Sequence, residues 1–196
     1  MILLSDYLIQ PKTKKAYGGR NMFDVFRNYY DEFLSALLEH IEISFIAIVT
    51  AIVLAIFVTI FLNFYKEFSH VTIYLFSLMY AIPSFALFAL LIPITGLGQT
   101  TAIIVLVIYA QYILVRTFLS GLSQVDKHVI EAAKAMGMTK WQILLKVQFP
   151  LAQKSFFAGL RLASTAIIAI ATIGATINAG GLGVILFDGL RTMNLT

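Results

Sequence analysis

The chain has 196 residues, of which 60% are hydrophobic and only 12% are charged. Soluble domains carry charged residues at about a quarter of their positions. The composition and a mean hydropathy of +0.89 therefore indicate an integral membrane protein and argue against a soluble enzyme. The chain has no cysteine, which excludes disulfides, thiolate metal sites and a cysteine nucleophile. Its net charge of +4 is spread along the sequence and gives no indication of a nucleic-acid partner.

The first forty residues are predicted to form a polar tail and an interfacial helix. Residues 1–20 are rich in polar residues and glycine, and their apolar patches are too short for the core of a signal peptide. Residues 22–40 mix charges with aromatic and aliphatic residues at helical spacing, which predicts an amphipathic helix lying at the membrane surface. A partner-binding helix is the alternative, and we favour the plain interfacial helix.

Residues 41–196 are predicted to form one all-α transmembrane domain with at least four spans. Each apolar run is long enough to cross a hydrocarbon core of about 30 Å at 1.5 Å per residue. The four runs are Ile41–Phe64, Val71–Pro93, Thr100–Leu119 and Phe156–Asn178.

Prolines and glycines predict where these helices kink or end. Pro83 lies inside the second span and would free a backbone carbonyl there, for which a structural kink is favoured over a gate. Pro93 marks the end of the same span. Gly180, Gly181 and Gly183 break the helix after the fourth span.

The polar interruption between the third and fourth spans, residues 123–150, is predicted to fold rather than to act as a linker. Ser123 and Asp126 have the spacing of a capping box for a first short helix, and Thr139 and Gln142 have the same spacing for a second. Gly137 can adopt the left-handed conformation that ends the first helix, and Pro150 marks a boundary before the fourth span.

The first of these short helices, residues 127–136, is predicted to be amphipathic. Its apolar face would hold Val129, Ala132, Ala133 and Met136. Its polar face would hold Lys127, Glu131 and Lys134, with Lys127 and Glu131 as an i,i+4 ion pair.

This segment resembles the EAA loop of ABC-importer permeases. Glu131-Ala132-Ala133 is followed after three residues by Gly137 and after nine more by residues 147–150, VQFP. The family pattern is EAA-x3-G-x9-I-x-L-P, so Val and Phe replace Ile and Leu. The resemblance implies a cytoplasmic loop whose coupling helix docks on an ATPase subunit, and it assigns that contact to Glu131, Ala132, Ala133, Met136 and Gly137.

Two further stretches resemble the quaternary-amine subfamily of these permeases. They are residues 81–98, with the pattern IPS-x-AL…P…G-x-G, and residues 180–192, with the pattern GGLG…GL-x-T. Asn178 stands where that subfamily usually has glycine. The resemblance implies uptake of glycine betaine, choline, carnitine or a related solute such as ergothioneine. It also leads us to expect a further helix, and in some relatives a binding domain, beyond residue 196.

The distribution of Lys and Arg predicts the orientation. The turn at residues 66–70 and the loop at 120–154 carry lysines, whereas residues 94–99 carry none. The positive-inside rule places the first two inside the cell and the N-terminus outside. Lys and Arg residues in the N-terminal tail contradict this orientation, and the loops, which also carry the motif, are given more weight.

The sequence lacks the residues that characterise other classes of membrane protein. There is no group of nucleophile and base for a membrane enzyme and no ionisable residue at mid-span for an ion-coupled carrier or channel. His40, His70 and His128 have no metal-ligand spacing. Gln111 is predicted to form an interhelical hydrogen bond, and Arg116 and Arg161 to extend towards the membrane surface.

The sequence therefore predicts a non-catalytic, multi-pass permease subunit in the plasma membrane of a prokaryote. No phosphate-binding loop is present, so ATP and Mg²⁺ would be bound by partner ATPase subunits, and this chain would need no cofactor or metal.

The other expected partners are a second permease subunit, identical or not, and an extracytoplasmic binding protein or fused domain. An amino-acid or ergothioneine-like solute and, less favoured, a secondary transporter are the alternatives. The aromatic residues show no cage-like grouping, so the permease is expected to bind its solute weakly.

Overall fold

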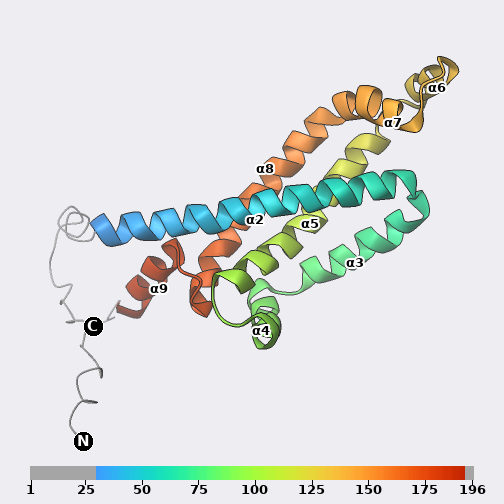
Figure 1. Ribbon diagram of the computed structural model, residues 1–196. Helices are drawn as coiled ribbons and strands as arrows, with labels where there is room; N and C mark the ends of the chain where they lie inside the picture. Colours follow the sequence, from blue (N-terminus) through green and yellow to red (C-terminus); the bar gives the residue numbers. More distant parts are fainter. Residues whose placement is uncertain (1–29, 193–196) are drawn as a thin grey trace, which may run out of the picture. The chain divides into compact units, whose positions relative to one another are not determined.

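The computed structural model describes residues 30–192 (Figure 1). The predicted tail and the first part of the predicted interfacial helix, residues 22–29, lie outside the described residues. The chain divides into two units, Met1–Glu32 and Phe33–Thr196. Every element assigned among residues 30–192 is helical, which confirms the all-α prediction.

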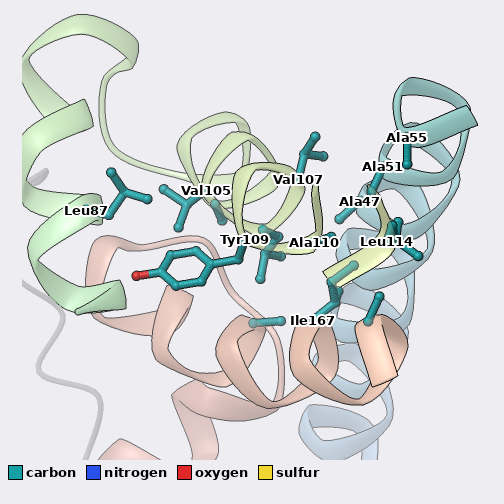
Figure 2. Packing of buried hydrophobic residues seen from close by; sticks show 14 of the residues in the cluster. Ala47, Ala51, Ala55, Leu87, Val105, Val107, Tyr109, Ala110, Leu114 and Ile167 are labelled. Carbon is teal, nitrogen blue, oxygen red and sulfur yellow. The ribbon is translucent and has the colours of Figure 1, made fainter. Parts of the chain in front are cut away.

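Helix α2, Tyr30–Phe64, contains the first span. It continues without a break through His40, so from Tyr30 onwards the predicted interfacial segment and the span belong to one helix. A stripe of buried, mostly small residues follows α2 at helical spacing: His40, Ile43, Ser44, Ala47, Ala51, Ala55, Thr59 and Leu62. Small side chains let neighbouring membrane helices approach closely, and Figure 2 shows Ala47, Ala51 and Ala55 facing the core cluster.

The second predicted span is interrupted at Pro83, as predicted, but as a full break between two helices rather than as a kink within one. After the short 3-10 helix Lys66–Phe68, helix α3 covers Ser69–Ala81 and helix α4 covers Ser84–Thr95, with a bend of 98° between them. Ile82 and Pro83 are extended, with ψ of 130° and 135°. A proline forces the preceding residue out of the helical region and supplies no N–H, which accounts for the break.

Helix α5, Gln99–Ser123, and helix α8, Phe149–Gly174, form the most extensive helix pair of the bundle. Glycines on both helices permit the close approach. A Cβ at Gly159 of α8 would overlap Thr117 of α5, and one at Gly121 of α5 would come 2.5 Å from the Cβ of Ser155. The buried core lies along α5, with Val105, Leu106, Leu114 and Val115 among its residues.

Two short helices connect α5 to α8. Helix α6 is Lys127–Ala135 and helix α7 is Lys140–Ile143. A π-helical turn, Leu144–Gln148, joins α7 directly to α8, so Lys140–Ile177 forms one continuous helical stretch of 38 residues. The boundary predicted at Pro150 is therefore wrong as a helix end. Pro150 lies inside this stretch, two residues after the π turn ends, where the regular i→i−4 hydrogen bonding is already interrupted.

A 3-10 turn, Ala175–Ile177, and helix α9, Leu182–Thr192, complete the described chain. By length and hydropathy, three helices among residues 30–192 can each cross a membrane, and a fourth span results if α3 and α4 are taken together. The bundle therefore has three to four spans, where the sequence predicts at least four.

Candidate functional site

The α6–α7 hairpin is built by local capping interactions at both of its helix starts. Asp126, and not Ser123 as predicted, caps α6, because its Oδ1 accepts a hydrogen bond from the backbone N–H of His128 at 2.8 Å. Ser123 is instead the last residue of α5 and its hydroxyl donates to the carbonyl of Ser120. A carboxylate at this position also favours the positive end of the helix dipole.

The turn between the two helices depends on Gly137. Its φ is +79°, and its N–H donates to the carbonyl of Lys134 at 2.9 Å while the N–H of Met138 donates to that of Ala133 at 3.1 Å. This pair of bonds is a Schellman motif, as the position of the glycine suggested. The predicted capping box at Thr139 and Gln142 is confirmed: the side chain of each accepts the backbone N–H of the other, at 3.3 and 2.8 Å.

Only one residue of the predicted apolar face of α6 packs against the rest of the chain, and the other three are exposed to solvent. Ala133 is buried, whereas Val129, Ala132 and Met136 are exposed. The side chain of Glu131 contacts that of His128, at 3.8 Å between two exposed side chains, rather than that of Lys127 as predicted. Such an exposed contact adds little stability.

The hairpin lies against the end of α2 and the turn that follows it. Trp141 of α7 contacts Phe64 of α2, with ring centroids 4.7 Å apart. A pocket between these elements is lined in part by Lys66, Lys134 and Lys140. The turn after the first span and the hairpin therefore lie at the same end of the bundle (Figure 1), as the distribution of lysines requires.

The predicted glycine break lies at the other end. Gly180 and Gly181 have φ of +85° and +79° and pack against Glu39 and His40 of α2. Gly183 lies inside α9, where a Cβ would overlap the backbone of Thr172, so it serves close packing. Asn178, in the place of the usual glycine, adopts the left-handed conformation with φ of 63°, which asparagine tolerates better than most residues.

Polar side chains also lie within the spans. The side-chain amide of Gln111 on α5 donates to the carbonyl of Ala51 on α2 at 3.1 Å, which confirms the predicted interhelical hydrogen bond. Next to it along the chain, Tyr109 and Tyr112 of α5 contact the ring of Tyr80 on α3. Sequence reasoning missed this group, because Tyr80 is distant in the chain and only the i,i+3 spacing on α5 signals it.

No group of three or more His, Cys, Asp or Glu within residues 30–192 is arranged to hold a metal ion.

A bundle of apolar helices with a capped hairpin between two of its spans defines a polytopic membrane subunit. The family model described as "Binding-protein-dependent transport system inner membrane component" matches residues 47–196. The chain belongs to this family and is a multi-pass transport permease of the bacterial plasma membrane.

Two similar proteins are transport permeases named for small solutes. The carnitine transport permease protein OpuCB of Listeria monocytogenes is 38% identical over 153 residues, covering 78% of this chain and 70% of the relative. The ergothioneine transport permease/ergothioneine binding protein EgtU of Helicobacter pylori is 44% identical over 118 residues, which are 60% of this chain and 21% of the relative. The chain thus spans about a fifth of that longer protein.

The solved structures support the fold. A chain of the inward-facing MetNI methionine ABC transporter superposes with a TM-score of 0.73 at 22% identity, covering 80% of this chain and 79% of its own. At this identity the likeness establishes the type I importer fold and not the solute.

Proposed function

We propose that the chain is the permease subunit of an ATP-driven importer for a quaternary-amine or betaine-like solute. The support is the family match together with relatives named for carnitine, for choline and for glycine betaine/carnitine/choline, at 33–38% identity. On this proposal the chain is not an enzyme. ATP and Mg²⁺ are bound by two partner ATPase subunits, and two permease subunits, identical or not, alternate between outward and inward access.

The α6–α7 hairpin carries the proposal. Val129, Met136 and Trp141 are 42%, 74% and 54% exposed on a hairpin that is capped at both helix starts. Val129 and Met136 are seven residues apart, which places them on one side of a helix, and exposed apolar side chains that share one side of an ordered projection are typical of a protein contact. Glu131, Ala132, Met136 and Gly137 are proposed to meet the ATPase subunit, whereas the buried Ala133 holds α6 against the bundle.

Co-purification of the ATPase subunit with matched variants tests this contact. Met136→Asp places a carboxylate in the proposed contact, and Lys127→Asp places one at an exposed position on the opposite side of the helix, nine residues or about 180° away. We expect Met136→Asp to lose the ATPase subunit and Lys127→Asp to retain it, with both chains inserted in the membrane. Retention by both variants, or equal loss in both, would argue against docking through this face.

An extracytoplasmic binding protein, free or fused, is proposed to select the solute. Removing it should abolish uptake at micromolar solute, and exchanging it for a docking-competent relative of different specificity should change the solute accepted. Tight binding of choline or glycine betaine to the permease alone would contradict this division of roles.

Ergothioneine is the second candidate solute, favoured by the 44% identity to the ergothioneine permease. Ergothioneine is itself a betaine with a trimethylammonium group and a carboxylate, so it shares the charged groups of carnitine and glycine betaine. Competition between labelled glycine betaine and unlabelled ergothioneine in the assembled importer distinguishes the two.

A further inference from the structure

Three tyrosines of two helices meet within the spans. Tyr80 of α3 lies with its ring centroid 5.6 Å from that of Tyr109 and 5.0 Å from that of Tyr112, both of α5. Tyr109 is buried, Tyr112 is half-buried, and Tyr80 is 39% exposed. We call these three residues the tyrosine cluster. Figure 2 shows Tyr109 projecting from α5 with its hydroxyl on the side where Leu87 of α4 lies.

The cluster lies close to the middle of the membrane. Tyr80 is eleven residues from the start of α3 at Ser69, and Tyr112 is eleven residues from the end of α5 at Ser123. Both of those helix ends are on the side of the coupling hairpin. At 1.5 Å per residue each tyrosine lies about 16 Å from that side, which is roughly half of a hydrocarbon core of about 30 Å.

The cluster also borders the break between α3 and α4. The hydroxyl of Tyr109 donates a hydrogen bond to the carbonyl of Ile82, the extended residue in the break. Ala81 and Pro83 on either side are exposed. Irregular backbone at membrane depth is tolerated only where protein covers it or where it lines a water-filled space. The exposed part of the break therefore fits a position against a partner subunit or a water-filled space, and broken helices at mid-depth are where transporters commonly place their solute sites.

A cation already contacts the cluster. The guanidinium carbon of Arg116, one turn from Tyr112 on α5, lies 5.5 Å from the centroid of the Tyr112 ring, and the guanidinium donates to the Tyr112 hydroxyl. Arg116 is exposed, and Tyr112 is its partner in both of these contacts. The ring thus attracts a cation by its electron-rich face, and the guanidinium remains accessible to an anion.

We propose that Tyr80, Tyr112 and Arg116 form a weak transit site for a zwitterion that carries a quaternary ammonium and a carboxylate. The ammonium rests against the tyrosine rings, where the guanidinium now lies. Arg116 turns to pair with the carboxylate. A quaternary ammonium has no hydrogen to donate, so aromatic faces are its natural partners. The class of solute rests on the proposed function.

The affinity of this site is low for a physical reason. The positive charge of Arg116 stays close to the bound ammonium and offsets part of its attraction to the rings. A site on a transport path must also release its solute. The site therefore agrees with selection by the binding protein, and it predicts millimolar rather than micromolar binding.

Saturation-transfer NMR on the purified permease–ATPase complex tests the site directly. The two probes are glycine betaine, which has both charges, and tetramethylammonium, which has only the cation. Both should give a signal from their methyl protons at millimolar concentration. Tyr80→Leu should reduce both signals at least threefold, while Tyr80→Phe, which keeps the ring, should preserve them. Tyr74→Leu, at an exposed tyrosine of the same helix, is the matched control and should change neither.

Arg116→Gln separates the two charges. It should reduce the signal of glycine betaine at least threefold and leave the signal of tetramethylammonium unchanged or stronger. Arg161→Gln, at an exposed arginine of α8, should change neither signal. Equal loss of both probes in Arg116→Gln, or no signal in the unaltered complex, would overturn the proposal and leave Arg116 as a side chain that only extends to the membrane surface. Uptake of glycine betaine by the unaltered importer with its binding protein tests the proposed function separately. Uptake without the NMR signal would refute the transit site alone.

Discussion

The carboxylate of Glu39 accepts a hydrogen bond at 3.0 Å from the backbone N–H of Gly181, a residue 142 positions further along the chain. The next residue, His40, is buried against the same turn, where a Cβ at Gly181 would lie 3.0 Å from its Nδ1. The first span is thereby tied to the glycine turn that precedes α9. Both Gly180 and Gly181 have positive φ, so the turn and the helix fit each other only with glycine at these positions.

Glu39→Ala should lower the free energy of unfolding by about 1.5 kcal/mol, because it removes a hydrogen bond to a charged acceptor. Glu39→Gln keeps an acceptor oxygen and should have a smaller effect. Thermal unfolding of the purified protein in detergent measures the difference. Glu42→Ala, at an exposed glutamate of the same helix, is the control, and an equal loss in this control would show that the bond to Gly181 is not the cause.

The contact between α5 and α8 predicts a compensating pair of substitutions. Gly159→Ala should destabilise the protein by about 1–3 kcal/mol, because the new Cβ overlaps the hydroxyl of Thr117. Adding Thr117→Ala removes that hydroxyl and should restore part of the loss. The remaining Cβ of Thr117 would be 3.1 Å from the new atom, so the rescue should be incomplete.

A double-mutant cycle on thermal stability measures this coupling. Gly189→Ala serves as the control, since a Cβ at that position meets nothing within 4 Å, and it should leave the stability unchanged or slightly raised. Purely additive effects of Gly159→Ala and Thr117→Ala would contradict the overlap.

Two glycines with positive φ separate coupling from folding. Gly137 and Gly96 have φ of +79° and +82°, and a Cβ at either would meet nothing within 4 Å. Valine should cost about 1–2 kcal/mol of backbone strain at Gly137 and about 1–3 kcal/mol at Gly96, whose ψ of −178° lies in a region that essentially only glycine adopts. Only Gly137→Val should reduce co-purification of the ATPase subunit and uptake, because only Gly137 turns the hairpin.

ATPase binding and uptake of the Gly137→Asn variant should lie between those of the native protein and of Gly137→Val, since asparagine tolerates the left-handed region better than most residues. If Gly96→Val reduces ATPase binding as much as Gly137→Val, the effect is one of global stability and the role of the hairpin turn is refuted.

Local signals in the sequence were sufficient for much of the hairpin. The box at Thr139 and Gln142 and the turn at Gly137 depend on residues within a few positions of one another, so the sequence alone specifies them. The start of α6 was harder to predict, because Ser123 and Asp126 are both good N-cap residues. The choice depends on α5 continuing through Ser123, which its packing against α8 decides.

Distant contacts decided what the sequence could not show. Proline alone predicts a kink at Pro83, but a 98° break also needs a partner for the carbonyl of Ile82, and the hydroxyl of Tyr109 supplies it from another helix. The tyrosine cluster is hidden for the same reason: Tyr80 reaches Tyr109 and Tyr112 only because α3 packs on α5. Pro150 by itself predicts a helix boundary, but the π turn before it joins α7 to α8.

Cysteine labelling tests the orientation on which the coupling role depends. Gln99 begins α5 and Lys127 follows its end, so the two exposed positions lie at opposite ends of a helix about 37 Å long. The chain has no native cysteine, so single substitutions give no background. We expect Gln99→Cys to react with a membrane-impermeant maleimide on intact cells and Lys127→Cys to react only after permeabilisation. Lys66→Cys should follow Lys127→Cys, because the contact between Phe64 and Trp141 places both at one end. The reverse pattern would place the hairpin outside the cell, away from ATP, and would support the orientation favoured by the lysines and arginines of the N-terminal tail.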